Sequence, residues 1–77
     1  MVTVHRAAGF RFIIYVDDHA PAHIHAVGPG EAKIDISGAA PRLVWAHGLT
    51  RADVRRVMAI VVEQQAMLLS RWRDIHG

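Results

Sequence analysis

Three of the six histidines in this chain fall within seven residues, in the stretch HAPAHIHA. His23 and His25 are two positions apart, so on a β-strand both side chains leave the same face with Cβ atoms roughly 6.5–7 Å apart. Two imidazoles at that spacing can converge on one metal ion at about 2.0–2.1 Å per bond. His19, four residues before His23, is a candidate third ligand. We therefore consider first a metal site made of His19, His23 and His25.

Two acidic residues, Asp17 and Asp18, directly precede this stretch and are candidate carboxylate ligands. A site of several histidines and one aspartate suits zinc, nickel, copper or iron. The sequence thus allows a divalent metal such as zinc or nickel as a cofactor.

The same histidines also suit acid–base chemistry. One imidazole takes a proton while the other, protonated, gives one up. Asp35, expected opposite His23, would hold the His23 tautomer, as carboxylates beside functional histidines do. Lys33 and Arg11 would bind a phosphate and stabilise negative charge that develops on it. Together these residues are the parts that a metal-free ribonuclease needs.

A third interpretation is a solvated strand with no ligand, since His-x-His pairs are common on exposed sheet faces and the motif has low specificity. The histidine-triad motif of nucleotide hydrolases does not match, because no third histidine follows His25 at the required spacing. The three interpretations remain open on the sequence alone.

Strand patterns surround the histidines. Residues 2–6, 10–16, 22–27 and 31–36 are rich in β-branched, aromatic and alternating apolar residues. Gly28-Pro29-Gly30 predicts a three-residue hairpin loop between the last two strands. The register that keeps both apolar sets on one side pairs Ile24 with Ile34, which sets His25 opposite Lys33 and His23 opposite Asp35.

Residues 37–48 look irregular, with a short strand over residues 42–45. A long helix follows, with Thr50 as N-cap and Asp53 completing a capping box, and it runs to Ile75. Its apolar residues keep helical spacing, and they are Val54, Val57, Met58, Val61, Leu68, Trp72 and Ile75. Gln65 interrupts that stripe.

These elements predict one α+β domain over residues 1–77. The expected fold is an antiparallel three- or four-stranded sheet in hairpin order with one long C-terminal helix packed on one face.

Composition narrows the possible function classes. The chain has no cysteine, which excludes a Cys-ligated zinc site. Its net charge is only +2, so contact with RNA is permitted but not indicated. Hydrophobic residues are 52% of a 77-residue chain, which favours a partner-covered surface in a homodimer or hetero-complex. The apolar run FIIYV is too short to span a membrane, and no signal sequence is evident, so a cytoplasmic protein is expected.

Several segments together carry a resemblance that covers essentially the whole chain. They are GFRFIIYV, HAPAHIHA, GEAKIDI and the helix that ends in WRDIHG. On these segments the chain resembles small bacterial proteins of the domain of unknown function 4160 family. His19, Pro21, His23 and His25 match the family's histidine-proline marker, and Ala20 and Ala22 stand where that marker has prolines.

The resemblance implies a gene neighbourhood of the toxin–antitoxin type, with a cognate small protein of the domain of unknown function 2442 family as partner. The expected function is a toxin-like component that binds or cleaves RNA through the histidine cluster. The alternative is a non-enzymatic interaction or regulatory module that binds a divalent metal through the same histidines.

Overall fold

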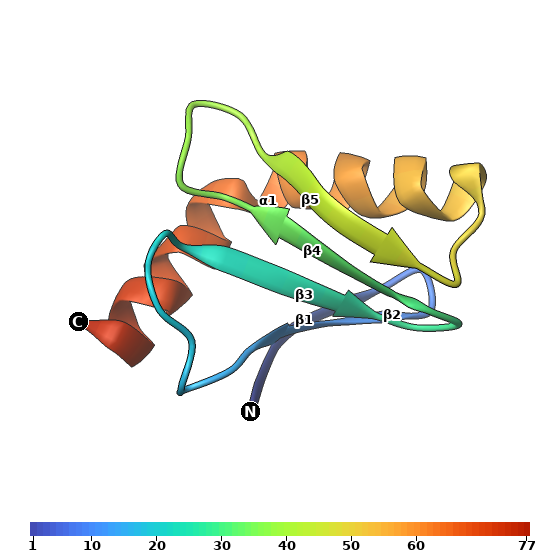
Figure 1. Ribbon diagram of the computed structural model, residues 1–77. Helices are drawn as coiled ribbons and strands as arrows, with labels where there is room; N and C mark the ends of the chain where they lie inside the picture. The colour runs from blue at the N-terminus through green and yellow to red at the C-terminus, as the bar shows by residue number, and fades with distance from the viewer.

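The computed structural model describes residues 1–77, and it consists of one five-stranded antiparallel sheet and one helix (Figure 1). The strands follow one another in hairpin order, and they are β1 (Val2–Ala7), β2 (Phe10–Ile14), β3 (His23–Val27), β4 (Glu31–Asp35) and β5 (Arg42–His47). Helix α1 (Arg51–His76) follows β5. The predicted α+β fold is confirmed, with one strand more than the largest number expected.

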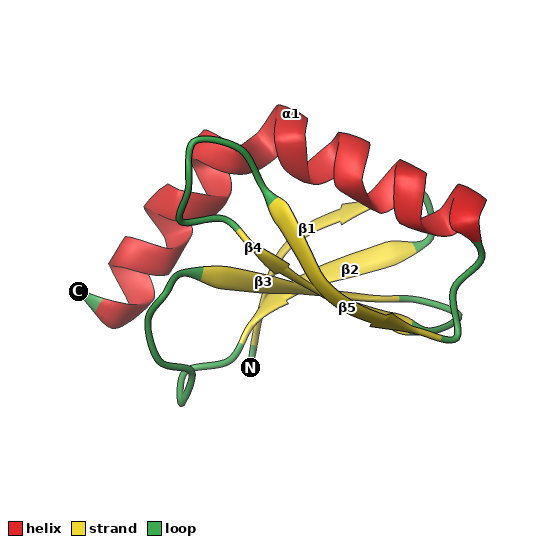
Figure 2. Cartoon of the chain, turned by 45° about the horizontal axis from the view of Figure 1, so that its top comes forward, coloured by secondary structure: helices red, strands yellow, loops and turns green.

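Helix α1 lies across one face of the sheet, and the other face carries no helix (Figure 2). The helix contributes Val57, Val61, Leu68 and Trp72 to the core between the two layers. The sheet contributes alternate residues, and they are Phe10, Phe12, Ile14, Ile24, Ala26, Ala32, Ile34 and Ile36. The two-residue period of the strands therefore decides which side chains meet the helix.

The predicted register between β3 and β4 is confirmed. Ile24 pairs with Ile34, His25 with Lys33 and His23 with Asp35. Both isoleucines are fully buried, so a slip by one residue would move them out of the core. The loop requires glycine at position 30, because it approaches the end of β5 so closely that a Cβ on Gly30 would collide with the carbonyl oxygen of His47.

The predicted strand over residues 10–16 ends two residues early, at Ile14. Tyr15 instead begins a turn, in which the backbone N–H of Asp18 donates to the Tyr15 carbonyl at 3.0 Å. Val16 is consequently exposed rather than core-facing. The strand expected over residues 42–45 is real and continues to His47.

Helix α1 begins at the predicted cap. The Thr50 hydroxyl accepts from the Asp53 backbone, and the Asp53 carboxylate accepts from the Thr50 backbone. The Thr50 N–H and hydroxyl, together with the nearby Arg56, hold the pKa of Asp53 below its ordinary value. The helix ends at His76, one residue beyond the prediction, and no segment of it is long and apolar enough to cross a membrane.

Gln65, which interrupts the apolar stripe, ties the helix to the loop after β4. Its side-chain amide donates to the carbonyl oxygens of Ile36 at 3.0 Å and Gly38 at 2.9 Å. These two carbonyls lie outside the strand ladder, so a polar side chain at this position satisfies acceptors that an apolar one would leave unpaired.

Candidate functional site

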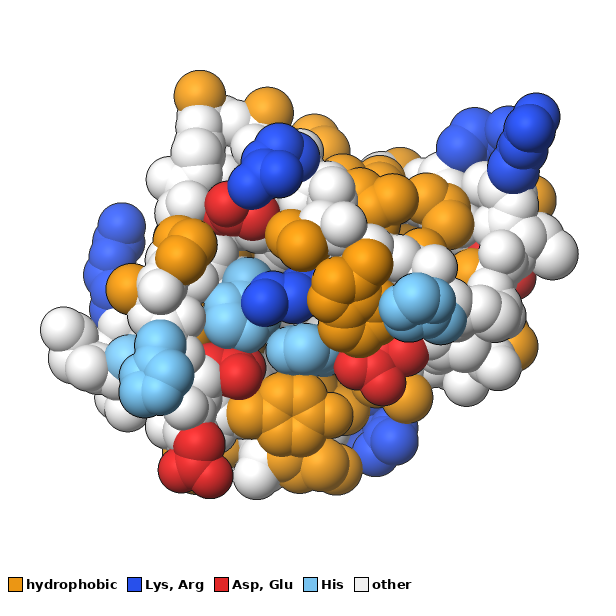
Figure 3. Space-filling model, viewed as in Figure 1, with side chains coloured by type: hydrophobic (Ala, Val, Ile, Leu, Met, Phe, Trp, Pro, Cys, Tyr) orange, Lys and Arg blue, Asp and Glu red, His pale blue; other side chains and the backbone are white.

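The face of the sheet away from α1, called the open face below, carries His23 and His25 from β3, Lys33 and Asp35 from β4, and Trp45 from β5. Figure 3 shows histidine, acidic and basic side chains gathered at the centre of this face, beside apolar ones. The two histidine side chains are nearly buried, with 8% and 11% of their surface exposed. Buried polar side chains need defined partners.

Asp18 reaches this face from the loop between β2 and β3. The turn that begins at Tyr15 directs its carboxylate back toward the strands, where Oδ2 also lies 3.4 Å from the Tyr15 backbone N–H as an acceptor. This oxygen is 3.1 Å from Nε2 of His23 and 3.7 Å from Nε2 of His25. One carboxylate oxygen therefore faces two imidazole nitrogens.

The other nitrogen of each ring is held by an oxygen. His23 Nδ1 lies 3.0 Å from the Pro21 carbonyl oxygen, and His25 Nδ1 lies 3.1 Å from a carboxylate oxygen of Glu31. A carbonyl and an ionised carboxylate only accept hydrogen bonds, so each Nδ1 must carry the hydrogen. In the neutral tautomers, each Nε2 is then an acceptor.

Three acceptor atoms consequently face one another with no donor between them. One ligand atom from each of His23, His25 and Asp18 lies within 4.8 Å of the others, and Nε2 of each histidine faces the same Asp18 oxygen. Lone pairs that point at the same place repel unless a hydrogen-bond donor or a cation sits among them, and the candidates are a water molecule from the cleft, a proton on an imidazole or a metal ion.

The spacing of the three atoms suits a metal ion. Ligand atoms about 2.1 Å from an ion at tetrahedral angles lie about 3.4 Å apart. The distances from the Asp18 oxygen to Nε2 of His23 and Nε2 of His25, 3.1 and 3.7 Å, lie on either side of that value. The ligand atoms of the two histidines lie within 4.8 Å of each other, so an ion would have to draw the two rings closer together only if they stand near that limit.

A cleft of about 520 Å³ opens next to these atoms. Its walls include both histidines, the 17–21 loop, Lys33, Asp35, Arg42 and Trp45. Aromatic rings pack around His25, with the Tyr15 ring 4.9 Å and the Trp45 ring 6.0 Å from it between centroids. The site is thus nearly enclosed by rings but accessible from the cleft.

Comparison with known families identifies the chain. The sequence profile described as "Domain of unknown function (DUF4160)" matches residues 9–73. The chain belongs to this family. No curated protein and no solved structure matches it. The part of the chain that matches DUF4160 contains Asp18, His23, His25 and Glu31, so the whole cluster lies within the family domain.

Asp35 takes a different role in this DUF4160 domain from the one expected. It lies opposite His23, but its carboxylate accepts from the Ser37 hydroxyl at 2.6 Å, the Ser37 backbone at 2.8 Å and Arg42 at 3.1 Å. The Ser37 hydroxyl, its N–H and the Arg42 guanidinium hold the pKa of Asp35 below its ordinary value. The carboxylate that contacts His23 is that of Asp18, because the turn at Tyr15 brings it closer.

Two other predicted site residues lie outside the group. His19 lines the cleft, but it is not among the three residues whose ligand atoms converge, and Asp18 takes the position expected for it. Arg11 lines a separate hollow with Arg6 around the β1–β2 turn rather than the cleft. Its place in the register, opposite Val27 near the far end of β3, explains the separation.

Sequence reasoning missed three contributors to the site. Glu31 holds His25, Arg42 lines the cleft beside Asp35, and Trp45 packs on His25. The strand register could have identified Trp45, because Lys33 pairs with His25 on one side and with Trp45 on the other. Glu31 pairs with Val27 and reaches His25 diagonally along the same face.

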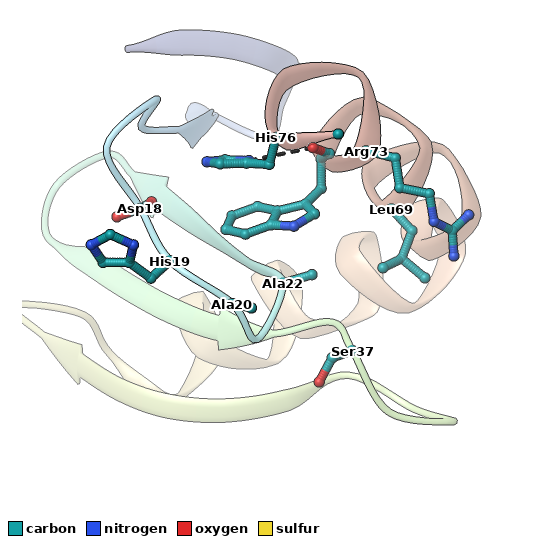
Figure 4. Close-up of a pocket in the computed structure, with 10 residues that line it drawn as sticks. Asp18, His19, Ala20, Ala22, Ser37, Leu69, Arg73 and His76 are labelled. Carbon is teal, nitrogen blue, oxygen red and sulfur yellow. Dashed lines mark hydrogen bonds between the residues drawn. The ribbon is translucent and has the colours of Figure 1, made fainter.

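A second hollow of about 580 Å³ lies on the other side of the same loop, between Asp18 and His19 and the C-terminal turns of α1 (Figure 4). His76 stacks on Trp72 with centroids 3.9 Å apart, and Trp72 rests against His23 at 5.2 Å. The end of the helix therefore packs against the His23 ring through Trp72.

Proposed function

We propose that this protein binds a divalent transition-metal ion through Asp18, His23 and His25. The observation that carries the proposal is the meeting of three acceptor atoms with both Nδ1 hydrogens already committed to Pro21 and Glu31. An ion among the three atoms removes the repulsion and accepts one lone pair from each of them.

A metal accounts for this arrangement better than protons do. A proton on Nε2 of His23 alone would join that ring to Asp18 but leave Nε2 of His25, 3.7 Å from the same oxygen, beyond hydrogen-bond distance, and protonating both rings would set two imidazoliums, with centroids 5.2 Å apart, against the single Asp18 carboxylate. Metal-bound histidines typically donate their other ring hydrogen to a carboxylate or backbone carbonyl. Glu31 and Pro21 are such acceptors, one for each ring.

Two imidazoles and one carboxylate are ligands that suit zinc, and also nickel, copper or iron. Three protein ligands leave the fourth tetrahedral position to water or a ligand. The cleft is the side from which such a molecule would approach.

A calorimetric titration of chelator-treated protein with Zn²⁺ tests the proposal. We expect one ion per chain, with affinity at least about 100-fold lower in Asp18→Asn, since even substitutions behind the ligands cost about 10–100-fold. Asp74→Asn is the control, because Asp74 is an exposed acid on α1 outside both the ligand group and the cleft. Equal affinities in the two variants, or no binding at all, would overturn the proposal.

A second candidate function is that of a toxin-like component that cleaves RNA, with His23 and His25 as acid and base. It is supported by Lys33, which lines the same cleft as the histidines and can receive a phosphate. Arg42 replaces Arg11 as the second cation, and Asp18 replaces Asp35 as the carboxylate that orients His23. If the protein has this second function, we expect it to act in the cytoplasm. Its partner would be a cognate small protein of the domain of unknown function 2442 type.

RNA cleavage by the purified protein in excess chelator, lost in His23→Ala plus His25→Ala, would support this second candidate. Intact RNA, with growth inhibition unchanged by the double substitution, would remove it. His47→Ala supplies the control, since His47 is on the same sheet but outside the cluster.

The chain is also proposed to associate, as a homodimer or with its cognate protein. Leu43 and Val44 are exposed on β5, which is an edge strand, and Val62 is exposed on α1. Edge strands with exposed apolar side chains pair readily with another chain. Light scattering of wild-type protein and Val44→Lys checks this, and a monomeric wild type that forms no complex with the cognate protein would contradict it.

A further inference from the structure

Lys33 is an unpaired cation beside the proposed metal site. It lies directly opposite His25 in the register, and residues opposite one another have Cβ atoms about 4.5–5.5 Å apart. Its ammonium group makes no ion pair in the structure, whereas the nearby Arg42 is held by Asp35. Lys33 is thus free to contact a ligand in the cleft.

The charge of the cleft changes sign when a dication binds. Three carboxylates line it (Asp17, Asp18 and Asp35) against two cations (Lys33 and Arg42), a net formal charge of −1. A divalent ion makes that charge +1. The empty cleft therefore repels an anion, and the loaded cleft attracts one.

Asp18, His23, His25 and Lys33 line the same cleft, so a molecule in it would be within reach of both Lys33 and an ion held by the other three. A phosphate group has several oxygens, so one oxygen can bind the ion while another accepts from the ammonium. Trp45, which also lines the cleft, provides a flat apolar surface next to these two positive groups.

From this juxtaposition we infer that the metal-loaded cleft binds the phosphate group of a phosphorylated ligand, between the ion and Lys33, and that the metal must bind first. The inference rests on the proposed metal site. It differs from the metal-free ribonuclease, which must hold phosphate without an ion.

Paramagnetic broadening of the ³¹P line of inorganic phosphate by Co²⁺-loaded protein tests the inference. We expect strong broadening with Co²⁺-loaded protein, and no phosphate binding by chelator-treated protein in calorimetry. Lys33→Met should weaken phosphate binding roughly tenfold, the value of a charge-assisted hydrogen bond, with Co²⁺ affinity unchanged. Arg6→Met is the control, because Arg6 is an exposed cation outside the cleft.

The outcomes separate the two claims. Failure to bind Co²⁺ overturns the metal site and this inference together, whereas Co²⁺ binding without phosphate broadening overturns this inference alone. Equal phosphate binding with and without metal, or no effect of Lys33→Met, also overturns it. In parallel titrations, a nucleoside monophosphate or a single-stranded oligonucleotide that binds more tightly than inorganic phosphate supports the site and assigns its source as nucleotide or nucleic acid.

Discussion

The two faces of the sheet are made from alternate residues of the same strands, yet they have opposite chemistry. On the face under α1, Ile24 and Ile34 are fully buried in an apolar core. On the open face, their neighbours His23, His25 and Lys33 meet in a polar cleft with Asp18. Consecutive residues along β3 and β4 therefore belong alternately to the core and to the site.

The fold and the site therefore depend on largely separate sets of side chains, and Trp72 is a core residue that also contacts the site, at the His23 ring. The core face is stabilised by burial of apolar area, which is not directional. The open face depends on a few distances between polar atoms, which small displacements abolish. Substitutions on one face should therefore leave the property of the other face largely unchanged, and this expectation can be tested by pairs of neighbouring residues.

The largest expected effect is on the core face. Ile34→Ala should lower the free energy of unfolding by about 2–5 kcal/mol, because it leaves a cavity in a fully buried position. Lys33→Ala, one residue away on the same strand, should change it by no more than about 0.5 kcal/mol. Urea denaturation measures both changes, and equal losses of stability in the two variants would contradict the difference between the faces.

A metal should stabilise the protein through the open face alone. Zn²⁺ at about 100 times its dissociation constant should raise the free energy of unfolding by about 2.7 kcal/mol. This gain in stability should disappear in His25→Ala, which removes a proposed ligand, and remain in Ile34→Ala, which does not. Urea denaturation with and without Zn²⁺ checks this, and a smaller increment in Ile34→Ala would mean that the two faces are coupled.

Glu31→Gln should have a smaller effect on the metal. Glu31 would act on the proposed ion only through His25, and substitutions of such outer partners typically lower metal affinity about 10–100-fold. Binding should remain at one ion per chain in a competition titration against a coloured chelator. Unchanged affinity would show that Glu31 does not hold the ring.

The smallest expected effect is that of low pH on stability through Asp35. Ser37 and Arg42 lower the pKa of Asp35 in the folded state, so the unfolded chain takes up the proton first as the pH falls. The Asp35 contribution to stability is present above the unfolded value of 3.8 and is lost as the pH falls from there through the lowered folded value. Urea denaturation between about pH 5 and pH 2 should show that the free energy of unfolding depends less on pH in Asp35→Asn than in the wild type. The same slope in both proteins would contradict this role.

Much of the fold followed from local patterns. Alternation predicted that Ile24 pairs with Ile34 because only that register buries both apolar sets, and the Thr50–Asp53 capping box marked the start of the helix. Gln65 looked like a defect in the stripe because its acceptors, the Ile36 and Gly38 carbonyls, are distant in sequence.

The site was only partly predictable. His23 and His25 were found from their spacing, since two residues apart on a strand means one face. Choosing Asp18 over His19 required the turn at Tyr15, and turn geometry in a loop of this length is weakly encoded in residue types. Asp35 was misassigned because register places backbones opposite one another, while Ser37 and Arg42 compete for the carboxylate.

The most direct test is a crystal structure of the Zn²⁺-loaded protein with diffraction data collected on both sides of the zinc absorption edge. We expect one anomalous peak at about 2.0–2.2 Å from Nε2 of His23, Nε2 of His25 and a carboxylate oxygen of Asp18. Full occupancy elsewhere, at His19, His47 or His76, or no peak in protein soaked at saturating Zn²⁺, would contradict it.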